Sequence, residues 1–320
     1  MQILLAIILL VLGFVLLIKG ADWFVDGAAG IAARFGIPQL VIGLTIVAMG
    51  TSAPEAAVSI TAATSGNAGI TIGNILGSNI LNVLLILGIT AAITTVAVQK
   101  STVKWEMPFM HIITIVLAVL GFTGGEIVLW EGIVLWALFL VYLGYLFKMA
   151  KNGTEEEEEE ELQPLWKQLC MLAVGIVMIV FGSDMTVDNA TILAEAFGMD
   201  DRLIGLTIVA FGTSLPELVT SVTAARKGKA DIAIGNIVGS NVFNILFVVG
   251  TTALITPVTF KAGFVIDSAV ALAAGLILWF GVMKEQKLKR PVGILMLAAY
   301  AAYFVYLKLL LSHKVLPLRV

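Results

Sequence analysis

The sequence predicts an all-α integral membrane protein with ten transmembrane helices, arranged as two inverted five-helix repeats. Three observations lead to this prediction. Hydrophobic residues make up 59% of the 320 residues and charged residues 13%, whereas soluble domains keep roughly a quarter of their residues charged. Apolar runs near the roughly 20 residues that cross a bilayer recur from end to end. The chain also repeats itself at a fixed offset.

The repeat appears when the sequence is shifted by 162 residues and compared with itself without a gap. Three pairs of segments carry the match: 42–48 with 204–210 (both IGLTIVA), 50–55 with 212–217 (GTSAPE, GTSLPE), and 73–79 with 235–241 (GNILGSN, GNIVGSN). A match of this length and regularity indicates a fused duplication, with each copy forming one structural unit.

Hydropathy predicts five membrane spans in each copy. The spans of the first copy are 3–33, 39–65, 70–96, 105–122 and 126–148; those of the second are 165–195, 201–226, 231–256, 262–282 and 291–311. We therefore divide the chain into a first repeat at 1–150, an acidic linker at 151–164, and a second, inverted repeat at 165–320. An odd number of spans makes the second copy enter from the opposite face, and such repeats place their sites near the midplane.

The first span of each copy is long and carries two acidic residues four positions apart. Asp22 and Asp26 in the first copy match Asp184 and Asp188 in the second. They shape a gate or an ion entry path, or else they cap helix ends and pair with Arg34 or solvent. The apolar start of the first span is not a cleavable signal peptide, because its match lies in the middle of the chain.

The second span of each copy contains a glutamate deep within apolar sequence, Glu55 in the first and Glu217 in the second. A carboxylate at that depth costs at least about 2.5–3.5 kcal/mol unless it is paired or hydrated. The glutamates either bond neighbouring hydroxyls and fix helix packing, or they are cation ligands that meet near the pseudo-twofold axis. Their surroundings favour cation ligands.

A proline precedes each glutamate and predicts a break in the helix. Pro54 and Pro216 have no N–H, so the carbonyls of Gly50 and Gly212 are expected to lose their helical partners. Irregular backbone at membrane depth persists only where it is buried in protein or lines a cavity. Carbonyl oxygens at 48–50 and 210–212 are therefore candidate ligands. Hydroxyls one turn from the glutamates add to them: Thr51, Ser52, Thr213 and Ser214.

The third span of each copy supplies a polar stripe with a spacing of four residues. The stripe is Asn74, Ser78 and Asn82 in the first copy and Asn236, Ser240 and Asn244 in the second. Residues four apart share one face of a helix. For Asn74 and Asn236 we leave coordination and plain interhelical hydrogen bonding open. The deeper four residues are predicted to be ligands.

The predicted ligands are all oxygen atoms. Cys170 is the only cysteine and His111 and His313 are the only histidines, which argues against a zinc enzyme or a thiolate metal site. Calcium takes six to eight hard oxygen ligands, whereas copper and zinc prefer nitrogen or sulfur. We expect no cofactor, no nucleic acid and no protein partner. Oxygen ligands favour Ca²⁺ and Na⁺ as the expected substrates, and the expected surroundings are the lipid bilayer.

Charge in the loops predicts the orientation. The linker contains seven glutamates, 155–161, which explain the net charge of −3; they form a solvated spacer rather than a calcium sensor, because they lack EF-hand spacing. Most Lys and Arg residues lie on the same predicted side of the membrane as the linker, for example at 226–229 and 284–290. The positive-inside rule then places the linker in the cytoplasm and both termini outside the cell membrane.

The paired motifs G-[TS]-S-x-P-E and G-N-x-x-G-S-N resemble the α-repeats of the cation/calcium exchanger superfamily, in its sodium/calcium exchanger branch. The resemblance covers essentially the whole chain. It implies first and sixth helices that slide past a rigid core, and adjacent cation sites built by the second, third, seventh and eighth helices. It implies these ligands: the carbonyls of Ala48 and Ala210, with Thr51, Ser52, Glu55, Ser78, Asn82, Thr213, Ser214, Glu217, Ser240 and Asn244.

Two differences within the superfamily bear on coupling. Proton/calcium exchangers carry a G-N-A-x-E type motif that neither repeat has, and potassium-dependent exchangers carry an aspartate where this chain has Asn244. The resemblance thus implies an electrogenic exchange of Na⁺ for Ca²⁺ without K⁺. Exchange with protons, or with potassium alongside sodium, is the alternative. A passive channel and an intramembrane aspartyl protease are more remote, because broken helices in inverted repeats indicate alternating access and the buried acids are glutamates.

Overall fold

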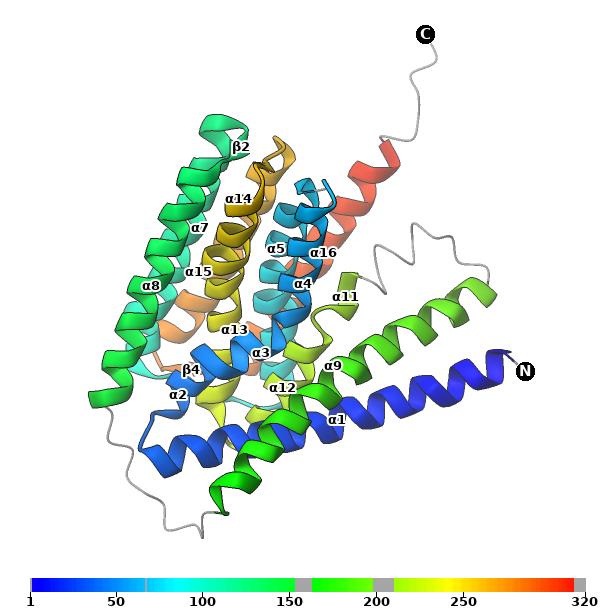
Figure 1. Cartoon of the computed structure of the whole chain (residues 1–320), viewed down its shortest axis with the longest axis vertical. Helices are drawn as coiled ribbons and strands as arrows, with labels where there is room; N and C mark the ends of the chain where they lie inside the picture. Colours follow the sequence, from blue (N-terminus) through cyan, green and yellow to red (C-terminus); the bar gives the residue numbers. More distant parts are fainter. Residues whose placement is uncertain (1, 67, 153–162, 198–209, 314–320) are drawn as a thin grey trace.

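The computed structural model describes residues 2–66, 68–152, 163–197 and 210–313, and this part is almost entirely helical (Figure 1). The glutamate tract 155–161 and the start of the predicted seventh span lie outside the described residues. The all-α membrane architecture with two inverted repeats is confirmed, and it is described below element by element.

The first repeat contains helices that follow the predicted spans closely. Its elements are α1 (Gln2–Phe35), α2 (Gln39–Ile42), η1 (Gly43–Val47), α3 (Ala48–Thr51), α4 (Ala53–Thr64), α5 (Gly69–Leu81), η2 (Asn82–Ile86), α6 (Leu87–Ile93), β1 (Val96–Ala97), η3 (Thr102–Glu106), α7 (Met107–Gly124), β2 (Glu126–Ile127) and α8 (Leu129–Asn152).

The second repeat follows the same order. Its described elements are α9 (Leu165–Ala196), α11 (Ala210–Gly212), α12 (Leu215–Arg226), α13 (Ala230–Phe243), η5 (Asn244–Val249), α14 (Gly250–Ile255), β3 (Val258–Thr259), α15 (Gly263–Met283), β4 (Lys287–Leu288) and α16 (Arg290–His313). Eight helices of the described part are long and apolar enough to cross a membrane, and the number is nine if the bent pair Gln39–Thr51 and Ala53–Thr64 counts as one span. The predicted tenth, 201–226, is described only from Ala210 onward.

The segments labelled η are π-helical turns within longer helices. Such turns are rare and occur often at functional sites. Two of them, η2 and η5, begin at Asn82 and Asn244, which occupy equivalent positions in the two repeats. The irregular backbone thus begins at two residues predicted to be ligands.

Two short strand pairs tie the repeats together. β1 pairs antiparallel with β4, and β2 pairs antiparallel with β3. At the offset of 162 residues β3 corresponds to β1 and β4 to β2, so the two pairs are themselves equivalent. The labels β2 and β4 lie toward opposite ends of the bundle in Figure 1, as inverted repeats require. These strands were not expected from the sequence.

The first helix of each repeat lies outside the upright bundle, where α1 and α9 run antiparallel and side by side (Figure 1). Glycines allow this close approach. A Cβ added to Gly20 would lie 2.9 Å from the carbonyl oxygen of Gly175, and one added to Gly182 would lie 2.9 Å from that of Gly13. Gly13 and Gly175 are repeat equivalents, as are Gly20 and Gly182, so the contact is symmetric.

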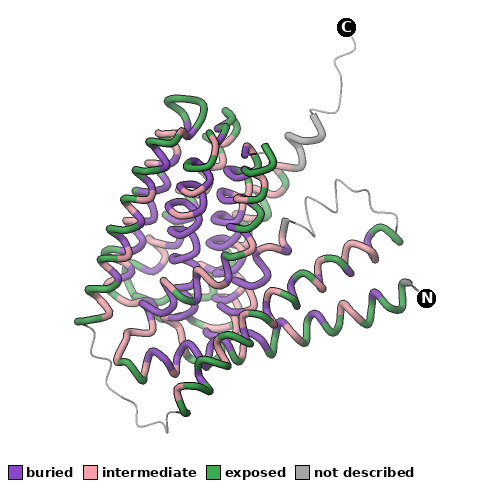
Figure 2. Tube along the Cα trace, in the orientation of Figure 1, coloured by how far each residue is buried: buried purple, intermediate pink, exposed green. Residues whose placement is uncertain are grey.

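The interior of the bundle is built by the third helix of each repeat. Every residue from Ile232 to Phe243 of α13 is buried, and buried residues gather in the centre of the molecule in Figure 2. Large apolar side chains cover the outside instead, such as Phe122 at 71% exposure and Phe147 at 75%. Water does not favour so extensive an apolar surface, and lipid explains it.

Candidate functional site

Both buried glutamates stand at the start of a helix that follows a break. The helix axis bends by 48° between Thr51 and Ala53, and Pro54 lies in the first turn of α4. In the second repeat Pro216 lies in the first turn of α12, after Ser214 in nearly the same backbone conformation as Ser52. The proline spacing therefore predicted the break. Helix N-termini favour negative charge, so each carboxylate is well placed there.

The backbone carbonyls near the breaks have more partners than the prolines suggested. The Gly212 carbonyl accepts the Ser183 hydroxyl at 2.8 Å. The Ala48 carbonyl accepts the Ser52 N–H at 3.0 Å and the Ser240 hydroxyl at 3.4 Å. Hydroxyl groups of other helices thus replace some of the backbone hydrogen bonds that are lost at the breaks.

Hydroxyl groups bring the two repeats together around the carboxylates. Oε1 of Glu217 accepts the Ser52 hydroxyl at 2.8 Å. Oε1 of Glu55 accepts the Ser78 hydroxyl at 3.2 Å and the Ser214 hydroxyl at 3.4 Å. Ser52 and Ser214 are repeat equivalents, so each glutamate is bonded by the serine of the opposite repeat. The two motifs form one site.

The remaining oxygens of the site are buried and have no hydrogen-bond partner. They are Oε2 of Glu55, Oε2 of Glu217, Oδ1 of Asn82 and Oδ1 of Asn244, and all four residues have 0% exposure. An unpartnered buried acceptor is costly, and a charged one more so. Among the described residues, the ion pairs involve only Asp22, Asp26 and Glu285 as acids. No described basic side chain therefore neutralises the two glutamates.

A cation fits this donor set. The unpartnered atoms are two carboxylate and two amide oxygens, the ligand type that Ca²⁺ and Na⁺ prefer over nitrogen or sulfur. Among the described residues, no three His, Cys, Asp or Glu side chains come together so that they could hold a metal ion. The site combines two carboxylates with neutral oxygens instead. The two carboxylates can balance the charge of a divalent ion, and the neutral oxygens can complete its coordination.

Asn74 and Asn236, whose role the sequence left open, brace neighbouring helices. The Asn74 amide donates to the Glu55 carbonyl at 3.2 Å and to Ser59 at 3.0 Å. The Asn236 amide donates to the Glu217 carbonyl at 3.4 Å and to Ser221 at 3.0 Å. Interhelical hydrogen bonding accounts for these two positions.

Two further predicted residues, Ala210 and Thr213, follow the gap at 198–209 in the described residues. Thr213 is half-buried and lines a cavity beside the site, and Ala210 is the first residue of α11. Sequence reasoning also missed four polar residues: Ser59, Ser221, Asn79 and Asn241. Their signal was duplication, since each pair is separated by the repeat offset.

A cavity of about 580 Å³ opens beside the site. Its walls are α4 and α9, its lining includes Pro54, Asp184 and Asp188, and it reaches Thr213. Ser214, the next residue, contacts Glu55. Two acidic side chains, Asp184 and Asp188, thus line a cavity that ends one residue from Ser214.

The equivalent acidic pair at α1 has a different environment. Asp22 and Asp26 both pair with Lys227, at 3.3 and 2.9 Å. Arg34, the partner considered from the sequence, donates instead to Gln168 and to the Gln163 carbonyl. The repeat equivalent of Lys227 is Ser65, so the second repeat cannot form the same ion pair. The two ends of the molecule therefore differ in charge pairing.

The Lys227 ion pairs are partly exposed, with 28% of the lysine side chain and 34% and 46% of the aspartates accessible. Exposed pairs of this kind stabilise by about 0.2–1 kcal/mol each. We therefore expect Lys227→Met to change the exchange rate by no more than about tenfold, and less at high salt. Flux assays at low and high ionic strength check this, with Lys229→Met as a control for loss of charge alone. Complete loss of transport would contradict the prediction.

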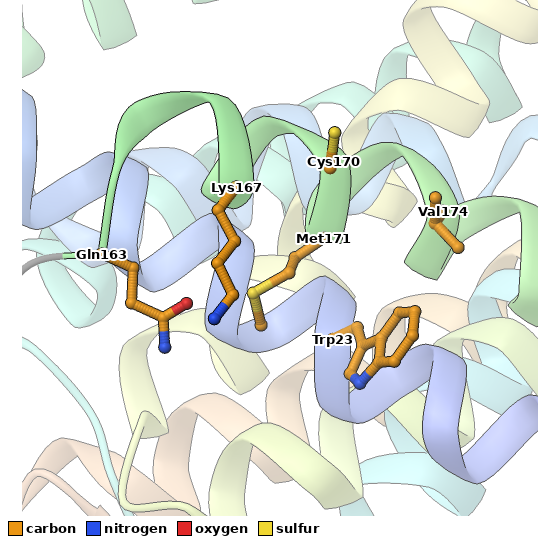
Figure 3. Close-up of a pocket in the computed structure, with 6 residues that line it drawn as sticks. All are labelled: Trp23, Gln163, Lys167, Cys170, Met171 and Val174. Atoms are coloured by element: carbon orange, nitrogen blue, oxygen red, sulfur yellow. The ribbon is translucent and has the colours of Figure 1, made fainter.

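A second cavity, of about 370 Å³, lies on the surface of the α1 and α9 pair. Figure 3 shows its lining: Trp23, Gln163, Lys167, Cys170, Met171 and Val174. This lining includes a lysine and no carboxylate, so it is unsuited to a cation.

The inverted repeats, broken helices and uncompensated buried carboxylates define a membrane carrier of cations. The family described as "Sodium/calcium exchanger protein" matches residues 5–148 and 167–309. The putative antiporter CaxA of Alkalimonas amylolytica is 41% identical, over 94% of this chain and 98% of that protein. The sodium/calcium exchanger MaX1 of Methanosarcina acetivorans is 32% identical, over 94% and 97%.

A solved structure of the sodium-calcium exchanger NCX_Mj superposes with a TM-score of 0.83 at 34% identity, covering 95% of this chain and 99% of that one. The chain belongs to the sodium/calcium exchanger protein family, which confirms the predicted resemblance. It is a multi-pass membrane transporter for cation/calcium exchange. Its family is described by the exchange of sodium and calcium. The protease hypothesis is set aside.

Proposed function

We propose that this chain exchanges Na⁺ for Ca²⁺ by alternating access, that each cycle moves net charge, and that K⁺ takes no part. The observation that carries the proposal is the pair of fully buried carboxylates, Glu55 and Glu217, without a described basic partner. Two negative charges balance one Ca²⁺ and offset part of its desolvation.

The ligands of the proposed site come from both repeats. They are the carbonyls of Ala48 and Ala210 and the side chains of Thr51, Ser52, Glu55, Ser78, Asn82, Thr213, Ser214, Glu217, Ser240 and Asn244. The unpartnered oxygens of Glu55, Glu217, Asn82 and Asn244 support the core of this set. The hydroxyls of Ser52, Ser78 and Ser214 donate to the carboxylates, which leaves the lone pairs of their oxygen atoms for an ion.

Charge balance implies that the cycle is electrogenic. One Ca²⁺ leaves the two-carboxylate site neutral, whereas three Na⁺ ions, as the family resemblance suggests, leave it with one positive charge. An inside-negative potential then favours Na⁺ entry and Ca²⁺ exit, by about 2.3 kcal/mol per 100 mV. Asn244 is a neutral amide, so a third carboxylate that would balance a potassium ion is missing from this position.

We further propose that the linker 151–164 is cytoplasmic and that both termini lie outside the plasma membrane. The basic residues between α12 and α13 and between α15 and α16 support this orientation. The cavity at Asp184 and Asp188 then faces the exterior, and the Lys227 ion pairs lie at the cytoplasmic end. The close, glycine-lined contact of α1 with α9 supports movement of these two helices as one unit past the bundle.

The test is Ca²⁺ uptake by purified protein in sealed proteoliposomes, with charge movement recorded on a solid-supported membrane. We expect uptake to require internal Na⁺ and to carry current, because three monovalent ions replace one divalent ion. Replacing internal Na⁺ by K⁺ or by a proton gradient should leave only the background of protein-free vesicles. Proton-driven uptake without Na⁺, or K⁺ flux coupled to Ca²⁺, would contradict the assigned coupling.

A further inference from the structure

Four asparagines form a reciprocal hydrogen-bonded cluster where the third helices of the two repeats meet. We propose that Asn79 and Asn241 are positioning residues, which orient the Asn82 and Asn244 amides so that oxygen, rather than NH₂, faces the cation. The inference deepens the proposed function and rests on Asn82 and Asn244 being ligands.

The orientation begins at two backbone carbonyls. The Asn79 side chain donates from Nδ2 to the Asn241 carbonyl at 3.2 Å, and the Asn241 side chain donates from Nδ2 to the Asn79 carbonyl at 3.3 Å. A carbonyl oxygen only accepts hydrogen bonds. Each side chain must therefore turn its NH₂ toward the opposite helix, and its own oxygen is directed elsewhere.

The second step passes this orientation to the ligands. Asn244 donates from Nδ2 to Oδ1 of Asn79 at 3.1 Å, and Asn82 donates from Nδ2 to Oδ1 of Asn241 at 3.1 Å. These bonds hold each NH₂ group away from the site. The Oδ1 atoms of Asn82 and Asn244 are buried and have no hydrogen-bond partner. A flipped amide would present hydrogens to the cation and repel it.

The position of the cluster supports this role. Asn82 and Asn244 are the first residues of the π-helical segments η2 and η5, and Asn79 and Asn241 precede them by three residues. All four residues are buried, at 0–4% exposure, so water does not compete for the amides. Each ligand in one repeat is oriented by a residue of the other, which couples the two halves of the site.

The cluster also makes the site selective for an amide at position 244. An aspartate there would place carboxylate oxygen against Oδ1 of Asn79, and two acceptors repel. If Asn79 turned over to donate to that aspartate, its oxygen would face the Asn241 carbonyl instead. The identity of residue 79 therefore decides whether an amide or a carboxylate is accepted at 244.

A double-mutant cycle tests this coupling. The variants are Asn79→Leu, Asn244→Asp and the double variant, with Thr90→Val as a control that removes a buried hydrogen bond of the same helix away from the site. The measurements are the KM for Ca²⁺ in Na⁺-driven uptake, the Na⁺/Ca²⁺ preference, and the thermal stability of each purified protein.

We expect each single variant to raise the Ca²⁺ KM about tenfold and the double variant to return within about threefold of the parent, a coupling typical of contacting residues. The rescue arises because a carboxylate presents oxygen in either orientation and no longer meets the Asn79 acceptor. Thr90→Val should leave the KM unchanged. A merely structural role for Asn79 would not be rescued by added charge at position 244.

The inference is overturned if folded Asn79→Leu binds Ca²⁺ like the parent, or if the double variant is worse than both single variants. Asn241→Leu with Asn82→Asp is the equivalent second cycle, for use if Asn79→Leu does not fold. Failure of both leucine variants to fold would assign the cluster to packing and also overturn it. Normal transport by Glu55→Gln would refute the proposed function, whereas an inactive Glu55→Gln with additive cycles refutes only this inference.

Discussion

Glu55→Gln and Glu217→Gln should each abolish Ca²⁺ exchange while leaving a folded, membrane-inserted protein. The amide keeps the shape of the side chain and its hydrogen-bond acceptor, so the contacts with Ser78 or Ser52 persist. The site loses one of two negative charges, and an uncompensated charge within the membrane costs at least about 2.5–3.5 kcal/mol, which is a factor of about 100 in binding. Flux in proteoliposomes, alongside thermal stability, measures both effects.

The matched control is Glu131→Gln. Glu131 is also buried, at 4% exposure, but it accepts the Val128 N–H at 2.8 Å at the start of α8. A glutamine still accepts that bond, so the control should retain exchange within about threefold. It should lose about 1 kcal/mol of stability, the difference between a hydrogen bond to a charged group and a neutral one. Near-normal flux in either site variant would show that the central pair is not the cation site.

The second large effect is expected at a glycine between the repeats. A Cβ added to Gly235 of α13 would lie 2.9 Å from the Gly43 Cα, the Leu40 carbonyl and the Leu44 nitrogen. These are all backbone atoms, so whole helices must separate to make room. We expect Gly235→Ala to destabilise the protein by about 1–3 kcal/mol, as overpacking does, and to impair exchange because the partner segment carries Ala48.

Gly144→Ala is the control, because Gly144 lies on the exposed side of α8. Among the described atoms, a Cβ added there would meet nothing within 4 Å. Thermal unfolding in detergent should therefore separate the two variants clearly. Equal stability of Gly235→Ala and Gly144→Ala would contradict the packing described for α13.

The sequence was sufficient for the architecture because repeat offset and hydropathy are both long-range, redundant signals. The break at residues 52–54 was predictable for a local reason, the missing N–H of Pro54. The strand pairs β1–β4 and β2–β3 were not predictable, since two-residue strands are too short to show a periodic pattern. Their partners also lie in different repeats, which a hydropathy profile cannot reveal.

The sequence predicted which residues form the candidate site better than it predicted which of them are hydrogen-bonded to each other. Ser52 lies one turn before Glu55 in sequence, yet its hydroxyl bonds Glu217 of the other repeat. Spacing along one helix identifies residues on a common face, but it does not say which helix lies opposite. Asn79 was missed for a related reason. It is adjacent to Ser78 and therefore lies outside the stripe of four-residue spacing.

The reciprocity of the asparagine cluster has a consequence for the ancestry of the molecule. Asn79 donates to the Asn241 carbonyl, and Asn241 donates to the Asn79 carbonyl. The hydrogen bonds from Asn82 and Asn244 are related in the same way by exchange of the two repeats. Contacts of this kind are isologous, the kind found across the dyad of a C₂ homodimer. A single half-length polypeptide inserted in both orientations would make every one of these bonds with its own antiparallel copy. The interface therefore needed no new residues when the two genes became one.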